Sequence, residues 1–132
     1  MIAVDSSVLI GVLKRAETPA TAAFRWLAGA DPLVIGDIVL LEVLRGASSE
    51  ARSEAIKAWL RSFTLVLMLG AASATRAAAH DRRLRELGIT PSSTPDVIIA
   101  SWCIAHAVPL LHQDRDFDLM AGPLGLPIHS LP

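Results

Sequence analysis

The 132-residue chain has only one cysteine, Cys103, so it can form neither an internal disulfide nor a Cys-x-x-Cys metal or redox pair. It has no apolar run close to the roughly 20 residues that cross a bilayer, since Asp37 and Glu42 interrupt the apolar stretch at residues 33–44. No basic segment precedes the first apolar residues, which is unlike a secretory signal. These absences predict a cytoplasmic protein without a membrane span.

The chain also lacks an excess of charge of either sign. Its formal net charge is −1, so no overall field pulls it onto nucleic acid as a strongly basic domain is pulled. Any contact with phosphate must therefore come from a local group of basic residues. The candidates are arginines, namely Arg45, Arg82, Arg83 and Arg115.

What the chain has in abundance is apolar surface. Hydrophobic residues make up 52% of the sequence, which indicates a well-filled core. A chain of this length builds one core, so residues 1–132 are expected to form a single domain. The apolar share is high for a small monomer, which suggests that another chain covers part of the surface.

Short apolar runs typical of buried strands alternate with stretches of helical periodicity. The expected strands are residues 2–4, 33–36, 64–69 and 109–111, with a last short apolar piece near Ile128. The helix starts are expected to be capped by Ser6 or Ser7, by Asp37, and by Thr94 with Pro95 and Asp96 at the next two positions. This alternation predicts an α/β fold, a three-layer α/β/α arrangement around a mostly parallel sheet of about five strands.

Several carboxylates occur where such a fold would gather them. Asp5 and Asp114 each follow an expected strand, and Asp96 begins the helix that leads into the last of these strands. The carboxyl ends of parallel strands meet at one edge of the sheet, where ligands of such folds bind. Carboxylates that lie close together repel, and either protonation or a hard divalent cation relieves the repulsion. The second answer implies phosphate chemistry, in which the ion activates water and neutralises the leaving oxygen.

Each of these acids also has a purely structural interpretation. Asp5 can end a strand and cap a turn, and Asp96 is favoured near a helix start by the helix dipole. Glu42, the fourth candidate, can be the solvent-facing residue of its helix, paired with Arg45. Asp114 can belong to a simple acidic turn with Asp116 and Asp118.

The histidines and tryptophans give weaker signals. His80, His106, His112 and His129 have no metal-ligand spacing and are interpreted as surface or core residues. Trp26, Trp59 and Trp102 fall on helical stripes and are expected in the core.

Four blocks of sequence resemble the signature motifs of PIN-domain nucleases. They are Val4-Asp5-Ser6-Ser7-Val8-Leu9-Ile10, Leu41-Glu42-Val43-Leu44-Arg45-Gly46, Pro95-Asp96-Val97-Ile98-Ile99-Ala100 and Asp114-Arg115-Asp116-Phe117. Each block is a weak motif alone, but together they span nearly the whole chain in the right order. The length, with nothing appended, is most similar to the VapC-type toxins of toxin–antitoxin modules.

The resemblance implies a PIN-like fold, an acidic pocket that binds Mg²⁺ or Mn²⁺, and endonucleolytic hydrolysis of RNA by metal-activated water. It implies a homodimer and inhibition by a cognate antitoxin. By motif, Asp5, Glu42, Asp96 and Asp114 match the catalytic acids, with Asp5, Asp96 and Asp114 as metal ligands. Ser7, Arg45 and the more variable acid Asp116 match supporting positions. His112 departs from the pattern, in which threonine or serine precedes the fourth acid by two residues.

Other functions remain open on the sequence. One is a catalytically silent PIN-like module that binds RNA or acts as a scaffold, and another is a nuclease that acts on DNA, since only contacts to the 2′-hydroxyl discriminate. An aspartyl-phosphate enzyme fits less well, because a phosphatase of that type usually has a second acid where this chain has Ser7. A receiver domain would need a lysine after a late strand, and none occurs beyond Lys57.

Overall fold

A computed structural model describes residues 1–91 and 93–132 of the chain. Its four strands are β1 (Ile2–Val4), β2 (Leu33–Gly36), β3 (Thr64–Val66) and β4 (Leu110–Leu111). Its seven helices are α1 (Ser6–Leu13), α2 (Pro19–Ala28), α3 (Asp37–Arg45), α4 (Glu50–Leu60), α5 (Ala71–Glu86), α6 (Thr94–His106) and α7 (Arg115–Leu124).

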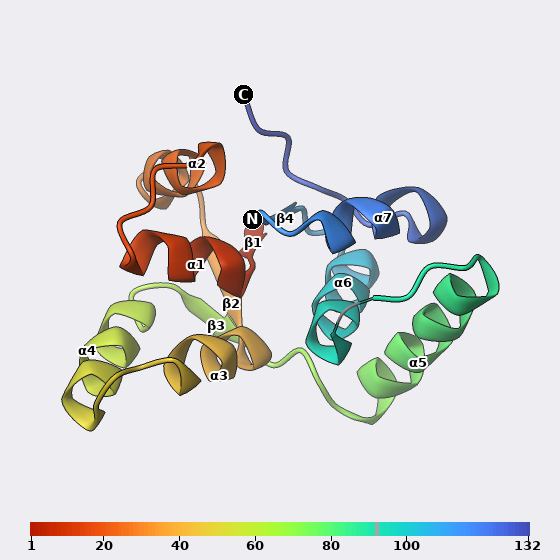
Figure 1. The fold of residues 1–132 in the computed structure, drawn as a ribbon, viewed down its shortest axis with the longest axis horizontal. Coiled ribbons are helices and arrows are strands. Elements are labelled where there is room, and N and C mark those ends of the chain that lie inside the picture. The colour runs from red at the N-terminus through yellow and green to blue at the C-terminus, as the bar shows by residue number, and fades with distance from the viewer. Residues whose placement is uncertain (92) are drawn as a thin grey trace.

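The strands form a parallel sheet in the order β3-β2-β1-β4. Every residue of β1 and β2 is buried, as expected for strands covered on both faces. Figure 1 shows the sheet in the middle, with α1 to α4 on one side and α5 to α7 on the other. The predicted three-layer α/β/α fold is confirmed.

The expected fifth strand is absent from the described residues. The segment near Ile128 makes a single parallel bridge to Leu110 rather than a ladder, so the sheet has four strands. The strand expected at residues 64–69 is also shorter and ends at Val66. Beyond it, the backbone N–H of Met68 donates to Oδ1 of Asp37 (2.8 Å), which ties this segment to α3 rather than to a strand.

The helix starts differ from the expected caps in three places. Asp5 itself caps α1, in place of Ser6 or Ser7, because its carboxylate accepts from the backbone N–H of Ser7. Gly36 is the N-cap of α3, so Asp37 is its first residue. Ser93 caps α6, which makes Asp96 the third residue of that helix.

Helix α7 was not anticipated, since its acids fitted a turn. Asp114 caps it, and Phe117 and Met120, three residues apart, bury its inner face. Pro123 lies in its last turn, and Gly125 ends it with a positive φ of 71°.

Aromatic residues fill the core on the α1 to α4 side. Phe24 packs against Trp59 (6.1 Å between ring centroids) and Phe63 (5.7 Å). Trp102 is buried as expected, but the expectation for Trp26 is wrong, since it is 71% exposed. Helix α2 buries Ala20, Ala23, Phe24 and Leu27, and position 26 points away from that face.

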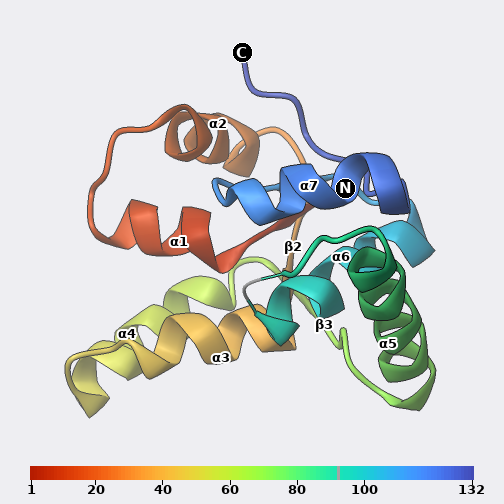
Figure 2. The ribbon, with the colours of Figure 1, turned by 45° about the vertical axis from the view of Figure 1, so that its right-hand side comes forward.

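Helices of one layer pack in pairs. Figures 1 and 2 both show α3 beside α4 and α5 beside α6, and these pairs are in contact. In the described residues, no helix is long and apolar enough to cross a membrane.

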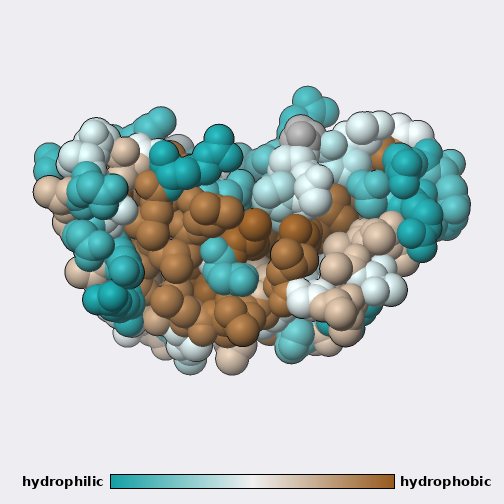
Figure 3. Space-filling model, turned by 90° about the horizontal axis from the view of Figure 1, so that it is seen from below, coloured by the Kyte–Doolittle hydropathy of each residue, from teal (hydrophilic) through white to brown (hydrophobic). Residues whose placement is uncertain are grey.

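One face of the molecule is apolar, and we call it the leucine face. It is defined by four exposed leucines, Leu41 on α3, Leu65 in the edge strand β3, and Leu67 and Leu69 on either side of Met68, whose N–H bonds Asp37 of α3. Figure 3, which views the molecule from below, shows a broad apolar area between hydrophilic surfaces on the left and right. A patch of this kind marks an interaction surface.

Candidate metal centre

The sheet order places a candidate site between β1 and β4. The chain leaves β1 for β2 on one side, whereas β4 lies on the other side of β1, and ligands of open α/β sheets bind at such a reversal, beyond the carboxyl ends of the strands. Asp5 follows β1 directly, and its backbone N–H donates to the carbonyl of Leu111 in β4 (3.0 Å). Asp114 follows β4 after two residues.

Asp5 is 2% exposed. Its Oδ2 accepts from the backbone N–H of Ser7 (3.0 Å) and from the Ser7 hydroxyl (2.5 Å). Its Oδ1 is buried without a hydrogen-bond partner among the described residues. Burial raises the pKa of Asp5 against the hydrogen bonds from Ser7 and Ser6, and the charge of Asp114 raises it further. A buried carboxylate oxygen without a donor is able to bind a cation.

Asp96 enters the site from the first turn of α6 and is 6% exposed. Burial, followed by the charges of Asp5 and Asp114, raises its pKa to about 7. The hydrogen bond from Ser93 favours the charged form, but it is the smaller effect.

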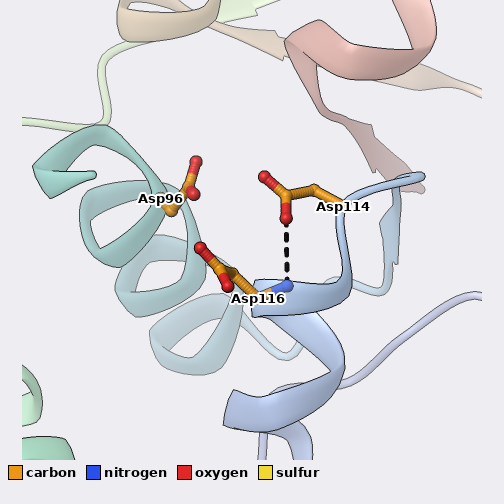
Figure 4. A group of neighbouring side chains, drawn as sticks. All are labelled: Asp96, Asp114 and Asp116. Carbon is orange, nitrogen blue, oxygen red and sulfur yellow. Dashed lines mark hydrogen bonds between the residues drawn. The ribbon is translucent and has the colours of Figure 1, made fainter. Parts of the chain in front are cut away.

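Asp114 and Asp116 come from the start of α7. Oδ1 of Asp114 accepts from the backbone N–H of Asp116 (3.0 Å), which fixes that carboxylate. Figure 4 shows the carboxylates of Asp96, Asp114 and Asp116 pointing toward one another. One oxygen from each of them lies within 4.8 Å of the other two.

Glu42 lies on α3 and is half-buried. It is therefore not the fully solvent-facing residue that a purely structural role would make it. Its Oε1 accepts from the Ser6 hydroxyl (3.1 Å), which ties α3 to the start of α1. Burial raises the pKa of Glu42, the charge of Asp5 raises it further, and Ser6 and Arg45 oppose the shift. Glu42 therefore lies within electrostatic range of the other acids.

A hard divalent cation fits this donor set. Oxygen ligands from carboxylates are what Mg²⁺ and Mn²⁺ bind, and the three aspartates offer three such oxygens at a distance one ion can bridge. The oxygen of Asp5 without a donor and the raised pKa of Asp96 both indicate negative charge that the protein itself does not neutralise. Asp5 is outside the tightest group, whereas Asp116, predicted as an accessory acid, is inside it.

The basic candidates are spread over the molecule. Arg115 lines, with Asp114 and His112, a hollow of about 430 Å³ beside the acids. Arg45 lies at the end of α3, close enough to affect the pKa of Glu42. Arg82 and Arg83 lie on α5, where Arg83 pairs with Glu86 (3.5 Å).

Sequence reasoning missed two residues that support the site, Ser6, which bonds Glu42, and Gln113, which bonds Ser7. His112 was noted only as a departure from the motif, and its Nδ1 accepts from the backbone N–H of Asp114. The backbone N–H of Gln113 donates to the Ser7 hydroxyl (3.2 Å), and its side chain bonds the Ser7 carbonyl (3.0 Å). The only available signal was proximity in sequence to a predicted acid, because the partners of Glu42 and Gln113 lie 36 and 106 residues away.

Comparison with known proteins agrees with this geometry. A family model described as PIN domain matches residues 2–123. Among curated relatives, Ribonuclease VapC51 of Mycobacterium tuberculosis is 32% identical over 117 residues, which cover 88% of this chain and 85% of that protein. Ribonuclease VapC11 of the same species is 25% identical over 123 residues, 92% of each chain.

Solved structures show the same fold at lower identity. VapBC2 from Rickettsia felis, bound to a promoter DNA fragment, matches with a TM-score of 0.79 and 17% identity over the whole of both chains. FitAcB from Neisseria gonorrhoeae matches with a TM-score of 0.74 and 15% identity over 98% of this chain and 97% of that one.

Proposed function

Because the chain belongs to the PIN domain family, we propose that it is a divalent-metal-dependent endoribonuclease and the toxin of a toxin–antitoxin pair. The observation that carries the proposal is the convergence of Asp96, Asp114 and Asp116 beside the buried oxygen of Asp5. The relatives named ribonucleases support RNA as the substrate. Four acids in place argue against a silent module.

In this proposal, Asp5, Asp96 and Asp114 hold Mg²⁺ or Mn²⁺, with Asp116 contributing to the same site. The bound cation supplies Lewis acidity toward an RNA phosphodiester and neutralises charge on the phosphate. Glu42 is proposed to accept the proton of the attacking water, and its raised pKa, which makes it a better base than an exposed glutamate, supports this role. Ser6 orients Glu42 and Ser7 orients Asp5. Arg115 is proposed to contact phosphate, which its position in the lining of the adjoining hollow supports.

The antitoxin is proposed to dock in an apolar groove between α1, α3 and α4, with a volume of about 330 Å³. Ile10, Leu13, Val43 and Ile56 supply its apolar lining. The two charged residues of this lining, Lys14 and Arg52, are both basic. The charge favours an amphipathic segment that carries carboxylates. A solved structure of the same fold, described as a toxin–antitoxin complex from Klebsiella pneumoniae, supports a protein partner of this class.

A second copy of the chain is proposed to cover the leucine face, giving a homodimer. Leu67 is 79% exposed and Leu41 60% exposed, and such large apolar side chains clustered on one face are stabilised by burial against a like surface.

The test is cleavage of pooled, end-labelled cellular RNA by the purified chain with Mn²⁺ or Mg²⁺, beside an EDTA control. Defined fragments are expected only with metal, and they should disappear in Asp96→Asn. Asp81→Asn, a matched change on α5, should cleave like the wild type. Intact RNA together with cleaved DNA would make the chain a DNA nuclease, and no cleavage of either would favour the silent module.

The toxin assignment has its own test in growing cells. Expression of the wild type should stop growth and Asp96→Asn should not. A library of the source genome should then yield the antitoxin that restores growth. Leu13→Asp in the groove should keep RNA cleavage and lose that rescue.

A further inference from the structure

His112 makes two directed contacts where β4 turns into α7. Its ring is buried, with 8% of the residue exposed. Nδ1 accepts a hydrogen bond from the backbone N–H of Asp114 (3.1 Å). Because a backbone amide can only donate, Nδ1 carries no hydrogen and Nε2 carries it. Nε2, the nitrogen that carries the hydrogen, lies 3.3 Å from Oδ1 of Asp118.

These contacts hold the turn from both ends. The ring connects the backbone of Asp114 to the side chain of Asp118 in the first turn of α7, and it packs against Phe117 with 5.1 Å between ring centroids. The carboxylate of Asp114 is fixed separately by the N–H of Asp116. The direction in which Asp114 faces Asp96 therefore depends on His112 as well as on the cap of α7.

We propose that His112 is a positioning residue of the metal centre, which sets the affinity for the divalent cation by holding the backbone of Asp114 in place. The inference rests on the proposed function, because it requires that Asp114 binds the ion. The contact that matters is the one from Nδ1 to Asp114. The contact to Asp118 orients the ring, but Asp118 is outside the group of acids that face one another.

Two variants separate the contact from the packing. In His112→Asn the side-chain oxygen stands on the same carbon as Nδ1 and can still accept from the Asp114 N–H, but nothing reaches Asp118. In His112→Leu the space stays filled with apolar atoms and both contacts are lost. His106→Leu is the control, since His106 ends α6, ten residues after Asp96. Its described contacts are both with Trp102 in its own helix, a hydrogen bond to the carbonyl (2.9 Å) and a stacked ring (4.3 Å between ring centroids).

The measurement is Mn²⁺ affinity by calorimetric titration, without RNA, together with the melting temperature in EDTA. We expect His112→Leu to weaken Mn²⁺ binding by about tenfold or more, the usual effect of losing a residue that orients a ligand. His112→Asn should recover most of the affinity, and His106→Leu should match the wild type. Equal affinities in wild type and His112→Leu would overturn the proposal, as would His112→Asn binding as weakly as His112→Leu.

If His112→Leu does not fold, His112→Asn is compared with His112→Gln, whose amide nitrogen can reach Asp118 instead. Weaker Mn²⁺ binding by the glutamine variant supports the proposal, and weaker or equal binding by the asparagine variant overturns it. A wild type that binds no Mn²⁺ removes the proposed function itself, whereas a wild type that binds Mn²⁺ and cleaves RNA leaves that function standing whatever the His112 variants do.

Discussion

The Ser6 hydroxyl donates a hydrogen bond to Oε1 of Glu42 across 3.1 Å and joins the first residue of α1 to α3. This contact fixes a half-buried carboxylate that lies close enough to Asp5 for the charge of Asp5 to raise its pKa. Glu42 is therefore within electrostatic range of that acid although it lies inside a helix, away from any strand end.

Ser6→Ala is predicted to slow RNA cleavage by about tenfold, since a hydrogen bond to a charged group contributes about 1.5 kcal/mol and that amount corresponds to roughly one decade in rate. The rate is measured on a labelled RNA at saturating Mn²⁺. Ser62→Ala, which removes an exposed hydroxyl bonded to the Trp59 carbonyl, serves as control. An unchanged rate in Ser6→Ala would show that Glu42 needs no such support.

Asp96 gives a pH dependence with a definite sign. Its pKa of about 7 in the folded chain lies above its ordinary value of 3.8, so between these values the folded state binds more protons than the unfolded state. Its contribution to the free energy of unfolding is therefore fully present below pH 3.8 and is lost as pH rises through about 7. In EDTA, the stability of the wild type minus that of Asp96→Asn should fall from pH 5 to pH 8. A difference that stays constant with pH contradicts the burial and charge repulsion inferred here.

The acids at strand ends could be predicted from sequence because the rule behind them is local. Asp5 and Asp114 follow apolar runs, and parallel strands deliver both to the same edge of the sheet. Ser7 was matched to a supporting position by the resemblance and does donate to Asp5, but the other supporting contacts could not be predicted. The contacts from Ser6 to Glu42 and from Gln113 to Ser7 join segments far apart in sequence, and nothing in the spacing of either pair indicates the partner.

The errors in the predicted fold also come from contacts between segments that are distant in sequence. The strand expected at 64–69 has β-prone residues throughout, but β3 ends at Val66 because Asp37 binds the next turn of the chain at Met68. Trp26 is a large apolar residue of the kind usually found in a core. The buried face of α2 instead carries Phe24 and Leu27, and Trp26 lies outside it. Hydrophobic periodicity predicts that a helix exists more reliably than it predicts which face of the helix is buried.

Asp116 is predicted to contribute directly to cation binding, which the sequence suggested only weakly. Asp116→Asn should lower Mn²⁺ affinity by about tenfold or more, since its oxygen lies within 4.8 Å of those of Asp96 and Asp114. Asp118→Asn, two residues on, keeps an acceptor for His112 and should change the affinity by less than about threefold. Calorimetric titration of both variants decides. Equal losses would mean that the net charge of α7, and not a ligand position, sets the affinity.

The leucine face predicts an oligomer that one charge can break. Leu67→Asp places a carboxylate on a surface that is buried in the proposed homodimer. Because both subunits of a two-fold dimer contribute the same patch, the interface would contain this carboxylate twice. The mass in solution, measured by light scattering, should fall from twice the chain mass to 14.0 kDa. Leu87→Asp, an equally drastic change of an exposed leucine at the end of α5, should leave the mass unchanged. A wild type of 14.0 kDa would rule out the homodimer.

Gly36, where β2 meets α3, tests the packing beneath the site. Its backbone is ordinary extended chain (φ −77°, ψ 153°), so an alanine is excluded only by space. A Cβ there would lie 2.3 Å from Sδ of Met68. Met68 is fully buried, and its N–H is held by Asp37, so the side chain has little room to withdraw. Gly36→Ala should therefore lower the free energy of unfolding by about 1–3 kcal/mol, the usual effect of overpacking a core.

The control for this effect is Gly46→Ala, whose Cβ would meet only the Val43 carbonyl at 3.6 Å and should cost nothing measurable. Denaturant unfolding in EDTA compares the variants without any contribution from metal. Repeating Gly36→Ala in a Met68→Ala background isolates the cause, because the clash disappears with the thioether. If Gly36→Ala is as costly there as in the wild type, the penalty comes from the backbone at the start of α3 and not from Met68.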